Sequence, residues 1–309
     1  MDRLKRYLHK KVIGVLYGGW SSEREVSINS GRCVLSSLKK QGFKVRGIDL
    51  DKNFIRKLKN IDLVFIALHG KPGEDGTVQG ILDFYGIPYT GSGVTGSAIG
   101  MDKIVTKSLL VAHRIPTPPF YYNKNINPEQ IIKALGLPVV IKPCAEGSSV
   151  GVSIVSTKKA LKQMIKKTLR KFPDIFFEKY IPGMMATCGI LNESALPVLE
   201  ICPKKKFYDY RSKYTEGMTE YIVPARIPKK KYRLLQKYAL QVHQTTRAYG
   251  FSRVDFVLDK DYNPYALEIN TIPGLLYGSN LPLEAKAAGL NYDQLILEIL
   301  KTALKRPGT

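Results

Sequence analysis

The stretch RVDFVLDKDYNPYALEINTIPG, residues 253–274, places two carboxylates and a carboxamide in two strand-like runs that are otherwise apolar. Side chains on a strand alternate between its faces, and the DKDYN segment between the runs has turn composition. Antiparallel pairing would therefore set Asp255 opposite Glu268 and Asn270. Facing carboxylates repel unless a cation lies between them, and Mg²⁺ prefers such hard oxygen ligands. The hairpin predicts a magnesium site, and a solvated face with turn acids is the alternative.

Composition indicates a well-packed globular protein with room for two or three domains. The chain has 309 residues, and 44% of them are hydrophobic. Its four cysteines form no CxxC pair and have no metal-ligand spacing, which favours a reduced, cytoplasmic protein. No apolar run approaches the roughly 18 residues of a membrane span, and no signal-type apolar core follows the basic N-terminus. We therefore expect a cytoplasmic location and no membrane partner.

The net charge of +22 is the most unusual global property of the chain. A field of this sign attracts nucleic acid, anionic lipid or anionic metabolites. Many of the lysines, however, fall on the polar face of an amphipathic helix predicted at 156–172. No nucleic-acid motif with interleaved aromatic residues accompanies them. The pattern favours a generally basic surface over a functional anion patch, and we do not expect nucleic acid as a partner.

The N-terminal unit, residues 1–94, alternates strands with helices. Strands are predicted at 12–19, 43–51 and 61–70, with helices at 26–42 and 80–86. This alternation is typical of a parallel sheet with helices on both faces. Ligands of such sheets bind beyond the carboxyl ends of the strands, where the loops GGWSSEREVS and HGKPGEDG lie. We expect both loops to line a site.

Two further units are predicted, a central one at 95–182 and a C-terminal one at 183–309. The C-terminal unit holds the acidic hairpin, a long helix at 229–249 and an irregular stretch near 207–222. An irregular segment of that length inside a compact domain is typical of a lid or binding loop.

The central unit carries features of a nucleotide site. Small residues in GSSVGVS (147–153) let backbone N–H groups approach phosphate oxygens, and the hydroxyls add donors. Lys142 and Lys103 would supply ammonium groups to the phosphates. The strand FFEKYI (176–181) fits a segment whose backbone reads an adenine edge while Glu178 accepts the exocyclic amine. Each feature has an ordinary alternative, namely a Gly/Ser turn, a solvated lysine or an interdomain linker.

In order along the chain, these motifs resemble those of the D-alanine–D-alanine ligases of the ATP-grasp superfamily. The resemblance runs from about residue 12 to 300 and is carried by GGWSSEREVSINSG, ALHGKPGEDGTVQG, IPYTGSGVTGSA..MDK..TK, LPVVIKP..EGSSVGVS, FEKYIPG, FYDYRSKY, RVDF and EINTIPG. It implies an α/β ATP-grasp fold of three α/β domains, the first with a parallel sheet. It also implies that ATP and two D-alanines give ADP, phosphate and D-alanyl-D-alanine through a D-alanyl phosphate, for peptidoglycan precursors.

The resemblance implies a set of site residues. The ATP-binding set is Lys103, Lys142, Ser148, Ser149, Glu178, Lys179 and Ile181. The ligands of two Mg²⁺ ions, with Mn²⁺ as a substitute, are Asp255, Glu268 and Asn270. The residues around the two amino acids are Glu23, His69, Ser148, Lys213, Tyr214, Arg253, Gly274 and Ser279.

The first alanine would lie between the N-terminal loops. The resemblance implies that Glu23 meets its ammonium, that Ser148 and Tyr214 link to Glu23, and that His69 lies beside the substrate. Taken alone, Glu23 also suits a helix-start acid, and His69 suits a hydrogen-bonded buried histidine.

The second alanine would lie beyond the acidic hairpin. Arg253 and Ser279 would meet its carboxylate, and Arg253 with the Gly274 N–H would face the developing oxyanion, an arrangement typically worth a few kcal/mol. Lys213 would bind the transferring phosphoryl group. The stretch near 207–222 becomes a lid that excludes water.

The chain departs from the family pattern at two places. Met185 stands where a Glu usually holds the ATP ribose hydroxyls, and a thioether cannot accept two hydroxyl bonds. After EINTIPG the family usually continues with a Met-Thr-Ser or Phe-Thr-Ser stretch, whereas this chain has LLYGSNLP. Ser279 is kept, but Leu276, Tyr277 and Gly278 change the wall of the second amino-acid pocket.

These departures keep other functions open. The Lys213-Tyr214 pair resembles the dipeptide-forming type, so we favour D-alanine at both positions. The alternatives are a ligase with another acceptor, such as D-serine or D-lactate, and a non-catalytic anion or nucleic-acid binder. The resemblance also implies a homodimer, for which the sequence itself shows no surface seam.

Overall fold

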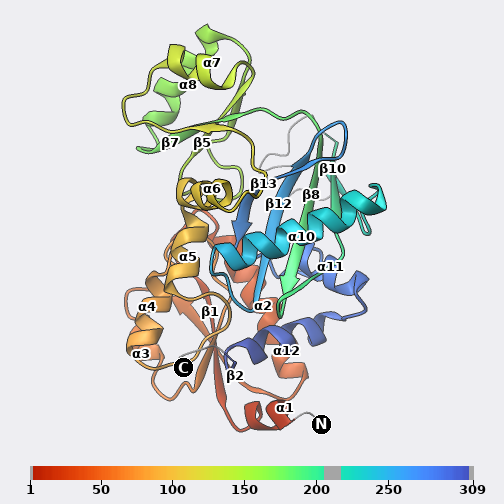
Figure 1. The fold of residues 1–309 in the computed structure, drawn as a ribbon. Coiled ribbons are helices and arrows are strands. Elements are labelled where there is room, and N and C mark those ends of the chain that lie inside the picture. The colour runs from red at the N-terminus through yellow and green to blue at the C-terminus, as the bar shows by residue number, and fades with distance from the viewer. Residues whose placement is uncertain (1–2, 205–216, 306–309) are drawn as a thin grey trace.

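A computed structural model describes residues 3–204 and 217–305. Lys213, Tyr214 and much of the expected lid lie outside this part of the chain. Figure 1 shows the N-terminal unit at the bottom, a small central unit at the top and the acidic hairpin between them. Within the described ranges, no helix is both long enough and apolar enough to cross a membrane.

The N-terminal sheet is parallel, as predicted, with strand order β2-β1-β3. Its strands are β1 (Val12–Gly18), β2 (Lys44–Leu50) and β3 (Leu63–Ile66), and its helices include α1 (Arg3–Leu8), α2 (Arg24–Lys40), α3 (Phe54–Lys57) and α4 (Thr77–Phe84). α2 ends just before Gly42, whose φ of 80° suits glycine in the turn into β2. β3 ends earlier than predicted, so His69 lies in the loop at its carboxyl end.

Two consecutive helices lead from this sheet to the central unit. They are α5 (Val94–Met101) and α6 (Lys103–Ala112). Asp102 separates them and caps α6, because its carboxylate accepts the backbone N–H groups of Ile104 and Val105. The cap fixes the first turn of α6, which carries Lys103.

The central unit is a four-stranded sheet in the order β4-β7-β5-β6, and every neighbouring pair is antiparallel. The elements are β4 (Phe120–Tyr121), α7 (Pro128–Leu135), β5 (Val139–Pro143), β6 (Ser153–Val155), α8 (Lys158–Leu169) and β7 (Ile175–Lys179). Leu161 and Ile165 of α8 pack into the core of this unit, which leaves the lysines of the helix on its outer face.

The third sheet carries the hairpin and has the order β11-β10-β8-β12-β13. Its strands are β8 (Met184–Leu191), β9 (Ser194–Ala195, paired with β8), β10 (Leu199–Pro203), β11 (Thr219–Ile222), β12 (Phe251–Leu258) and β13 (Pro264–Asn270). α10 (Lys229–Thr245) packs across this sheet (Figure 1). It ends four residues before the predicted boundary, because Arg247 and Gly250 adopt positive φ.

The end of the chain returns to the N-terminal unit. α11 (Asn280–Ala287) packs on β8, and α12 (Tyr292–Thr302) packs on α2 (Figure 1). Ile296 and Ile299 therefore belong to the same buried cluster as the β1 residues. The division into units at 94/95 and 182/183 stays a prediction.

Candidate active site

The acidic hairpin is formed by β12 and β13. Asp255 lies directly opposite Glu268, as predicted, and Asn270 lies opposite Arg253. Arg253 donates from Nε to Asp255 Oδ1 at 2.7 Å and from Nη2 to Oδ2 at 2.9 Å. Asn270 Nδ2 donates to Asp255 Oδ2 at 3.3 Å. All four side chains therefore meet at one point of the sheet.

The predicted metal ligands fit Mg²⁺. Asp255, Glu268 and Asn270 line one cavity and offer hard oxygen donors. Their carboxylates are balanced by cations, since Arg253 binds Asp255, and Lys103 Nζ lies 3.2 Å from Glu268 Oε2. Among the residues described, no group of three or more His, Cys, Asp and Glu could hold a metal. The predicted set is not a group of that kind, because it has two carboxylates and takes its third oxygen donor from the Asn270 carboxamide.

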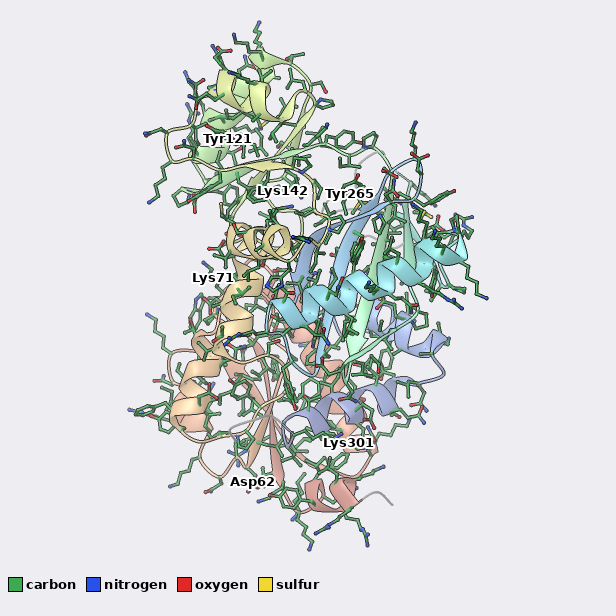
Figure 2. The ribbon with its side chains drawn as sticks, in the orientation of Figure 1. Asp62, Lys71, Tyr121, Lys142, Tyr265 and Lys301 are labelled. Carbon is green, nitrogen blue, oxygen red and sulfur yellow. The ribbon has the colours of Figure 1, made fainter. Side chains whose placement is uncertain are left out.

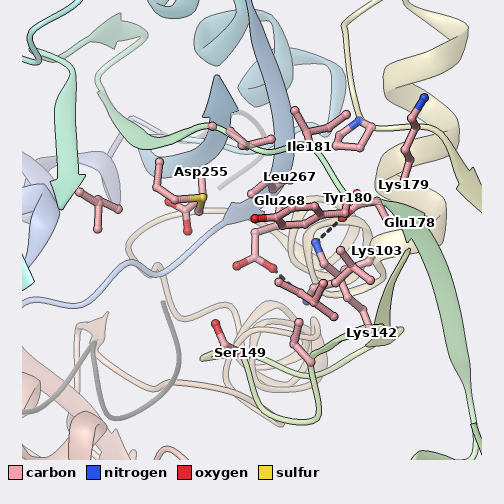
Figure 3. A pocket seen from close by; sticks show the side chains of 18 of the residues that line it. Lys103, Lys142, Ser149, Glu178, Lys179, Tyr180, Ile181, Asp255, Leu267 and Glu268 are labelled. Atoms are coloured by element: carbon pink, nitrogen blue, oxygen red, sulfur yellow. Dashed lines mark ion pairs between the residues drawn. The ribbon is translucent and has the colours of Figure 1, made fainter. Parts of the chain in front are cut away.

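A first cavity, of about 350 Å³, lies between the central unit and the third sheet (Figure 3). Six of the seven residues of the predicted ATP set line it, namely Lys103, Lys142, Ser149, Glu178, Lys179 and Ile181. Ser148 lines the neighbouring cavity instead. Figure 2 shows Lys142 where the small central unit meets the region of α6.

Lys103 joins the loop before β6 to the hairpin. Its Nζ donates to the backbone oxygen of Glu146 at 2.6 Å while it pairs with Glu268, and its own N–H donates to the oxygen of Cys144 at 3.0 Å. The ion pair is drawn in Figure 3. An ammonium in this position faces the space between the loop and the predicted metal ligands.

Glu178 is held between two ammonium groups. Its side chain is only 2% exposed, and its two carboxylate oxygens form ion pairs with Lys142 and with Lys107. Burial opposes the charged form, but the two lysines outweigh it and hold the pKa of Glu178 below its usual value. In the sequence analysis, Lys107 was quoted only as the last residue of the motif MDK..TK and was given no role. Its signal was its place one turn after Lys103 on the same face of α6.

A second cavity, of about 420 Å³, meets the first at Asp255 and Glu268, which line both. Its wall includes most of the residues predicted around the amino acids, namely Glu23, His69, Ser148, Arg253, Gly274 and Ser279. They come from loops of all three units and, for Arg253, from strand β12. Lys213 and Tyr214 lie outside the described residues.

One end of the second cavity is formed by the N-terminal loops. Ser148 Oγ donates to Glu23 Oε1, which is the first half of the predicted Glu23–Ser148–Tyr214 link. His69 is buried, its Nε2 lies 3.0 Å from Ser30 Oγ, and burial lowers its pKa even though Glu23 opposes the shift. His69 is therefore a neutral imidazole at neutral pH.

Glu74 is a second acid in this cavity that the sequence analysis quoted only within its motif. Its Oε2 accepts the Gly70 N–H at 2.7 Å, and its Oε1 accepts the Ile272 N–H at 3.3 Å. Burial and the nearby Glu23 raise the pKa of Glu74 to about 8. The side chain ties the loop after β3 to the loop after β13, a contact between distant segments that no local pattern reveals.

Comparisons with known proteins agree with this arrangement. Residues 115–301 match the family model described as D-ala D-ala ligase C-terminus, and residues 51–92 match D-ala D-ala ligase N-terminus. The chain is 44% identical over 306 residues to a D-alanine–D-alanine ligase of Carboxydothermus hydrogenoformans, covering 95% of this chain and 98% of that one. The chain belongs to the D-alanine–D-alanine ligase family.

Solved structures give the same result. The D-alanine–D-alanine ligase from Bacillus anthracis complexed with ATP superposes with a TM-score of 0.85 at 35% identity, covering 96% of this chain and 98% of that one. The VanG D-Ala:D-Ser ligase from Enterococcus faecalis superposes with a TM-score of 0.82 at 29% identity, covering 95% and 99%. The fold is thus an ATP-grasp ligase fold, shared by ligases with different named acceptors.

The two departures from the family pattern lie at different walls of the site. Met185 lines the nucleotide cavity. Leu276 and Gly278 line the second cavity, next to Ser279. Tyr277 points elsewhere, because it is 57% exposed and packs on Tyr292 with ring centroids 4.2 Å apart. Of the three residues predicted to change the wall of the second amino-acid pocket, Leu276 and Gly278 line it and Tyr277 does not.

Proposed function

We propose that the chain uses ATP to join two D-alanines into D-alanyl-D-alanine for peptidoglycan precursors. The observation that carries the proposal is the meeting of two cavities at Asp255 and Glu268. A nucleotide in the first cavity can place its γ-phosphoryl group there. An amino acid in the second can place its carboxylate at the same point, as direct phosphoryl transfer requires.

The residues of the first cavity would position the ATP base and neutralise the charge of its phosphates. Glu178, Lys179 and Ile181 line the part of the cavity suited to the base. Lys103 and Lys142 provide ammonium groups for the phosphates, and the loop with Ser149 covers them. Asp255 and Glu268 adjoin this end of the cavity and would repel the negative phosphates of ATP. A cation between the carboxylates and the phosphates is therefore needed.

Asp255, Glu268 and Asn270 would hold two Mg²⁺ ions, or Mn²⁺. When bound, the metal neutralises the charge that develops on the phosphoryl oxygens. In the protein alone, Arg253 pairs with Asp255 and Lys103 pairs with Glu268. A bound metal would take over the neutralisation of these carboxylates and leave both cations available to the substrates.

The first D-alanine is oriented by Glu23. Its ammonium pairs with the Glu23 carboxylate, which Ser148 fixes through the hydrogen bond described above. A carboxylate oxygen of this alanine attacks the γ-phosphorus, so a C–O–P bond forms, the bond to ADP breaks and D-alanyl phosphate results. Neutral His69 lies beside the substrate without adding a second positive charge.

The second D-alanine is held at the opposite end. Arg253 and Ser279 bind its carboxylate. Its amine, as the free base, attacks the acyl carbon, and the proton lost from its nitrogen goes to the departing phosphate. The Arg253 guanidinium and the Gly274 N–H stabilise the oxyanion, which collapses with loss of phosphate. A side chain on Gly274 would place its Cβ 3.1 Å from Ser279 Oγ and crowd this group. Lys213 and Tyr214 keep their proposed roles at the phosphoryl group and at Glu23.

The metal role predicts the effect of Glu268→Gln. Loss of one ligand charge removes several kcal/mol of charge stabilisation, so kcat falls on the order of a thousandfold. Binding of Mn²⁺, followed by electron paramagnetic resonance, weakens in parallel, and Tm is unchanged. Glu129→Gln, an exposed carboxylate on α7, serves as the control and changes neither. Normal turnover by a folded Glu268→Gln protein would contradict the metal assignment.

Acceptor choice needs its own experiment, because Leu276 and Gly278 line the acceptor end and a D-Ala:D-Ser ligase shares the fold. ADP release is measured with D-alanine alone and with D-alanine plus D-serine, D-lactate or L-alanine, and product masses are recorded. D-alanine alone is expected to give the dipeptide mass. Turnover only with a second substrate would establish the altered-acceptor ligase instead.

We also propose a cytoplasmic location. All four cysteines are free thiols in the structure, which suits a reducing compartment. A homodimer stays a prediction of the resemblance.

A further inference from the structure

Lys107 has no part in the reaction described above, yet it is completely buried. Lysine is almost never fully buried unless it is paired. Its Nζ donates to Thr117 Oγ1 at 2.6 Å, forms an ion pair with Glu178 and lies 5.7 Å from the centre of the Phe120 ring. Thr117 in turn donates to the backbone oxygen of Ala266 at 2.7 Å. The ammonium is therefore fixed from several sides.

Lys107 and Lys142 form ion pairs with different oxygens of the Glu178 carboxylate. Lys107 binds one carboxylate oxygen and does not line the nucleotide cavity, whereas Lys142 binds the other oxygen and does line it. Figure 3 shows the Lys142–Glu178 pair at the cavity wall. With all three groups ionised, the cluster carries one net positive charge.

That extra charge has a consequence for nucleotide binding. With Lys142 as its only partner, Glu178 would cancel the charge of the lysine that the phosphates need. Movement of Lys142 to a phosphate would then leave a buried carboxylate unpaired, which is strongly unfavourable. Lys107 removes this conflict because it remains with Glu178. Burial lowers the pKa of Lys107 to about 8, with Glu178 opposing, so the ammonium is still the major form at pH 7.

We propose that Lys107 is a positioning residue of the nucleotide site. It holds Glu178 ionised and oriented as an acceptor for the base, and it frees Lys142 for the phosphates. An ionised carboxylate only accepts hydrogen bonds, so it favours a purine with a 6-amino group over one with a 6-oxo group. Lys107 thus contributes to the choice of ATP over ITP. The inference rests on the proposed ATP site.

The test is equilibrium binding of ATP and of ITP, with Mg²⁺ and without D-alanine, measured by calorimetry on the full chain. Lys107→Met removes the ammonium at similar volume. It is expected to weaken ATP binding by tenfold or more and to bring the ATP/ITP affinity ratio close to one. The matched control is Lys133→Met, an exposed lysine on α7, which leaves both affinities unchanged.

A double variant tests whether the effect passes through Glu178. In a Glu178→Gln background, Lys107→Met should change the ATP/ITP ratio little further. A Lys107→Met protein with wild-type Tm and a wild-type ATP/ITP ratio would overturn the proposal, as would fully additive effects in the double variant.

Thr117→Val covers the case in which Lys107→Met does not fold. It keeps the ammonium but removes its hydroxyl partner, and it should lower the ATP/ITP ratio a few-fold; an unchanged ratio would refute the proposal. The assay needs no ligation. A chain that behaves as expected here but makes no dipeptide would refute the proposed function and leave the role of Lys107 standing.

Discussion

At the residue scale, position 185 bears most directly on how the nucleotide sugar is held. Met185 is on β8, paired with Ile201 of β10 on one side and Val257 of β12 on the other, and all three line the nucleotide cavity. A thioether is a weak acceptor. Around Met185 the described wall of the cavity is therefore apolar, and in the ATP complex that we propose it would offer the ribose hydroxyls no strong acceptor.

Met185→Glu should restore an acceptor for the ribose. A hydrogen bond to a charged group contributes about 1.5–3 kcal/mol, which is reduced here by the burial of the carboxylate, so KM for ATP should fall by about three- to tenfold. KM is measured at saturating D-alanine. With 2′,3′-dideoxy-ATP the gain should vanish, and an equal gain with both nucleotides would rule out a ribose contact.

Individual residues differed in how far the sequence could predict them. The alternation of side chains on a strand was enough to place Asp255 against Glu268, because both lie in one hairpin. Lys107 and Glu74 were quoted only within their motifs and given no role, since their partners Glu178 and Ile272 come from distant segments. A polar residue whose partner is remote in sequence has no local pattern that distinguishes it from a solvated one.

At the element scale, β10 is fixed by an ion pair. Glu200 is buried on this strand and accepts from Arg226 through Nη2 at 2.7 Å, Nε at 3.0 Å and the backbone N–H at 3.2 Å. These hydrogen bonds lower the pKa of Glu200 from 4.5 to about 2, although burial opposes the shift. Since β10 also carries Ile201, the pair supports one wall of the nucleotide cavity.

The lowered pKa of Glu200 gives a pH-dependent prediction. A carboxyl with a depressed folded-state pKa stabilises the fold above its unfolded pKa of 4.5, and this contribution is lost as the pH falls towards 2. Because Arg226 is largely exposed, we expect only about 1 kcal/mol. The free energies of unfolding of wild type and Glu200→Gln, from urea titrations, should differ at pH 6, and the difference should shrink as the pH is lowered from about 4.5 towards 2. A difference that is constant with pH would contradict this origin.

The boundaries of elements were predicted less well than their order. The helix expected at 229–249 is present, but it ends at Thr245, and its predicted end was wrong because the positive φ of Arg247 has no sequence signature. The strand expected at 61–70 ends at Ile66, and the remaining apolar residues continue into the loop that carries His69.

At the scale of the whole molecule, the two ends of the chain share one core. Ile299 of α12 is fully buried in the cluster that contains the β1 residues, and Asp293 of the same helix accepts from Ser37 of α2 at 2.8 Å. No prediction was made for this helix in the sequence analysis, because its contacts are with α2, which lies far away in the sequence. The C-terminal helix therefore packs on α2, the helix that begins directly after Glu23.

Ile299→Ala tests whether the packing of α12 in the N-terminal core stabilises the protein. Removal of a fully buried isoleucine side chain typically costs 2–5 kcal/mol, so Tm should fall clearly and the N-terminal core should lose protection in hydrogen exchange. The control is Ile55→Ala on α3, where the side chain is 40% exposed and a small effect is expected. Equal, small effects of both substitutions would show that α12 does not support the N-terminal core.

The central claim is that a phosphoryl group passes from ATP in the first cavity to the carboxylate of D-alanine in the second. The most direct measurement uses D-alanine labelled with ¹⁸O in both carboxylate oxygens and follows the mass of the phosphate formed during turnover. If D-alanyl phosphate is the intermediate, each phosphate carries one ¹⁸O atom and the dipeptide mass appears with it. Unlabelled phosphate, released together with the dipeptide, would contradict the account.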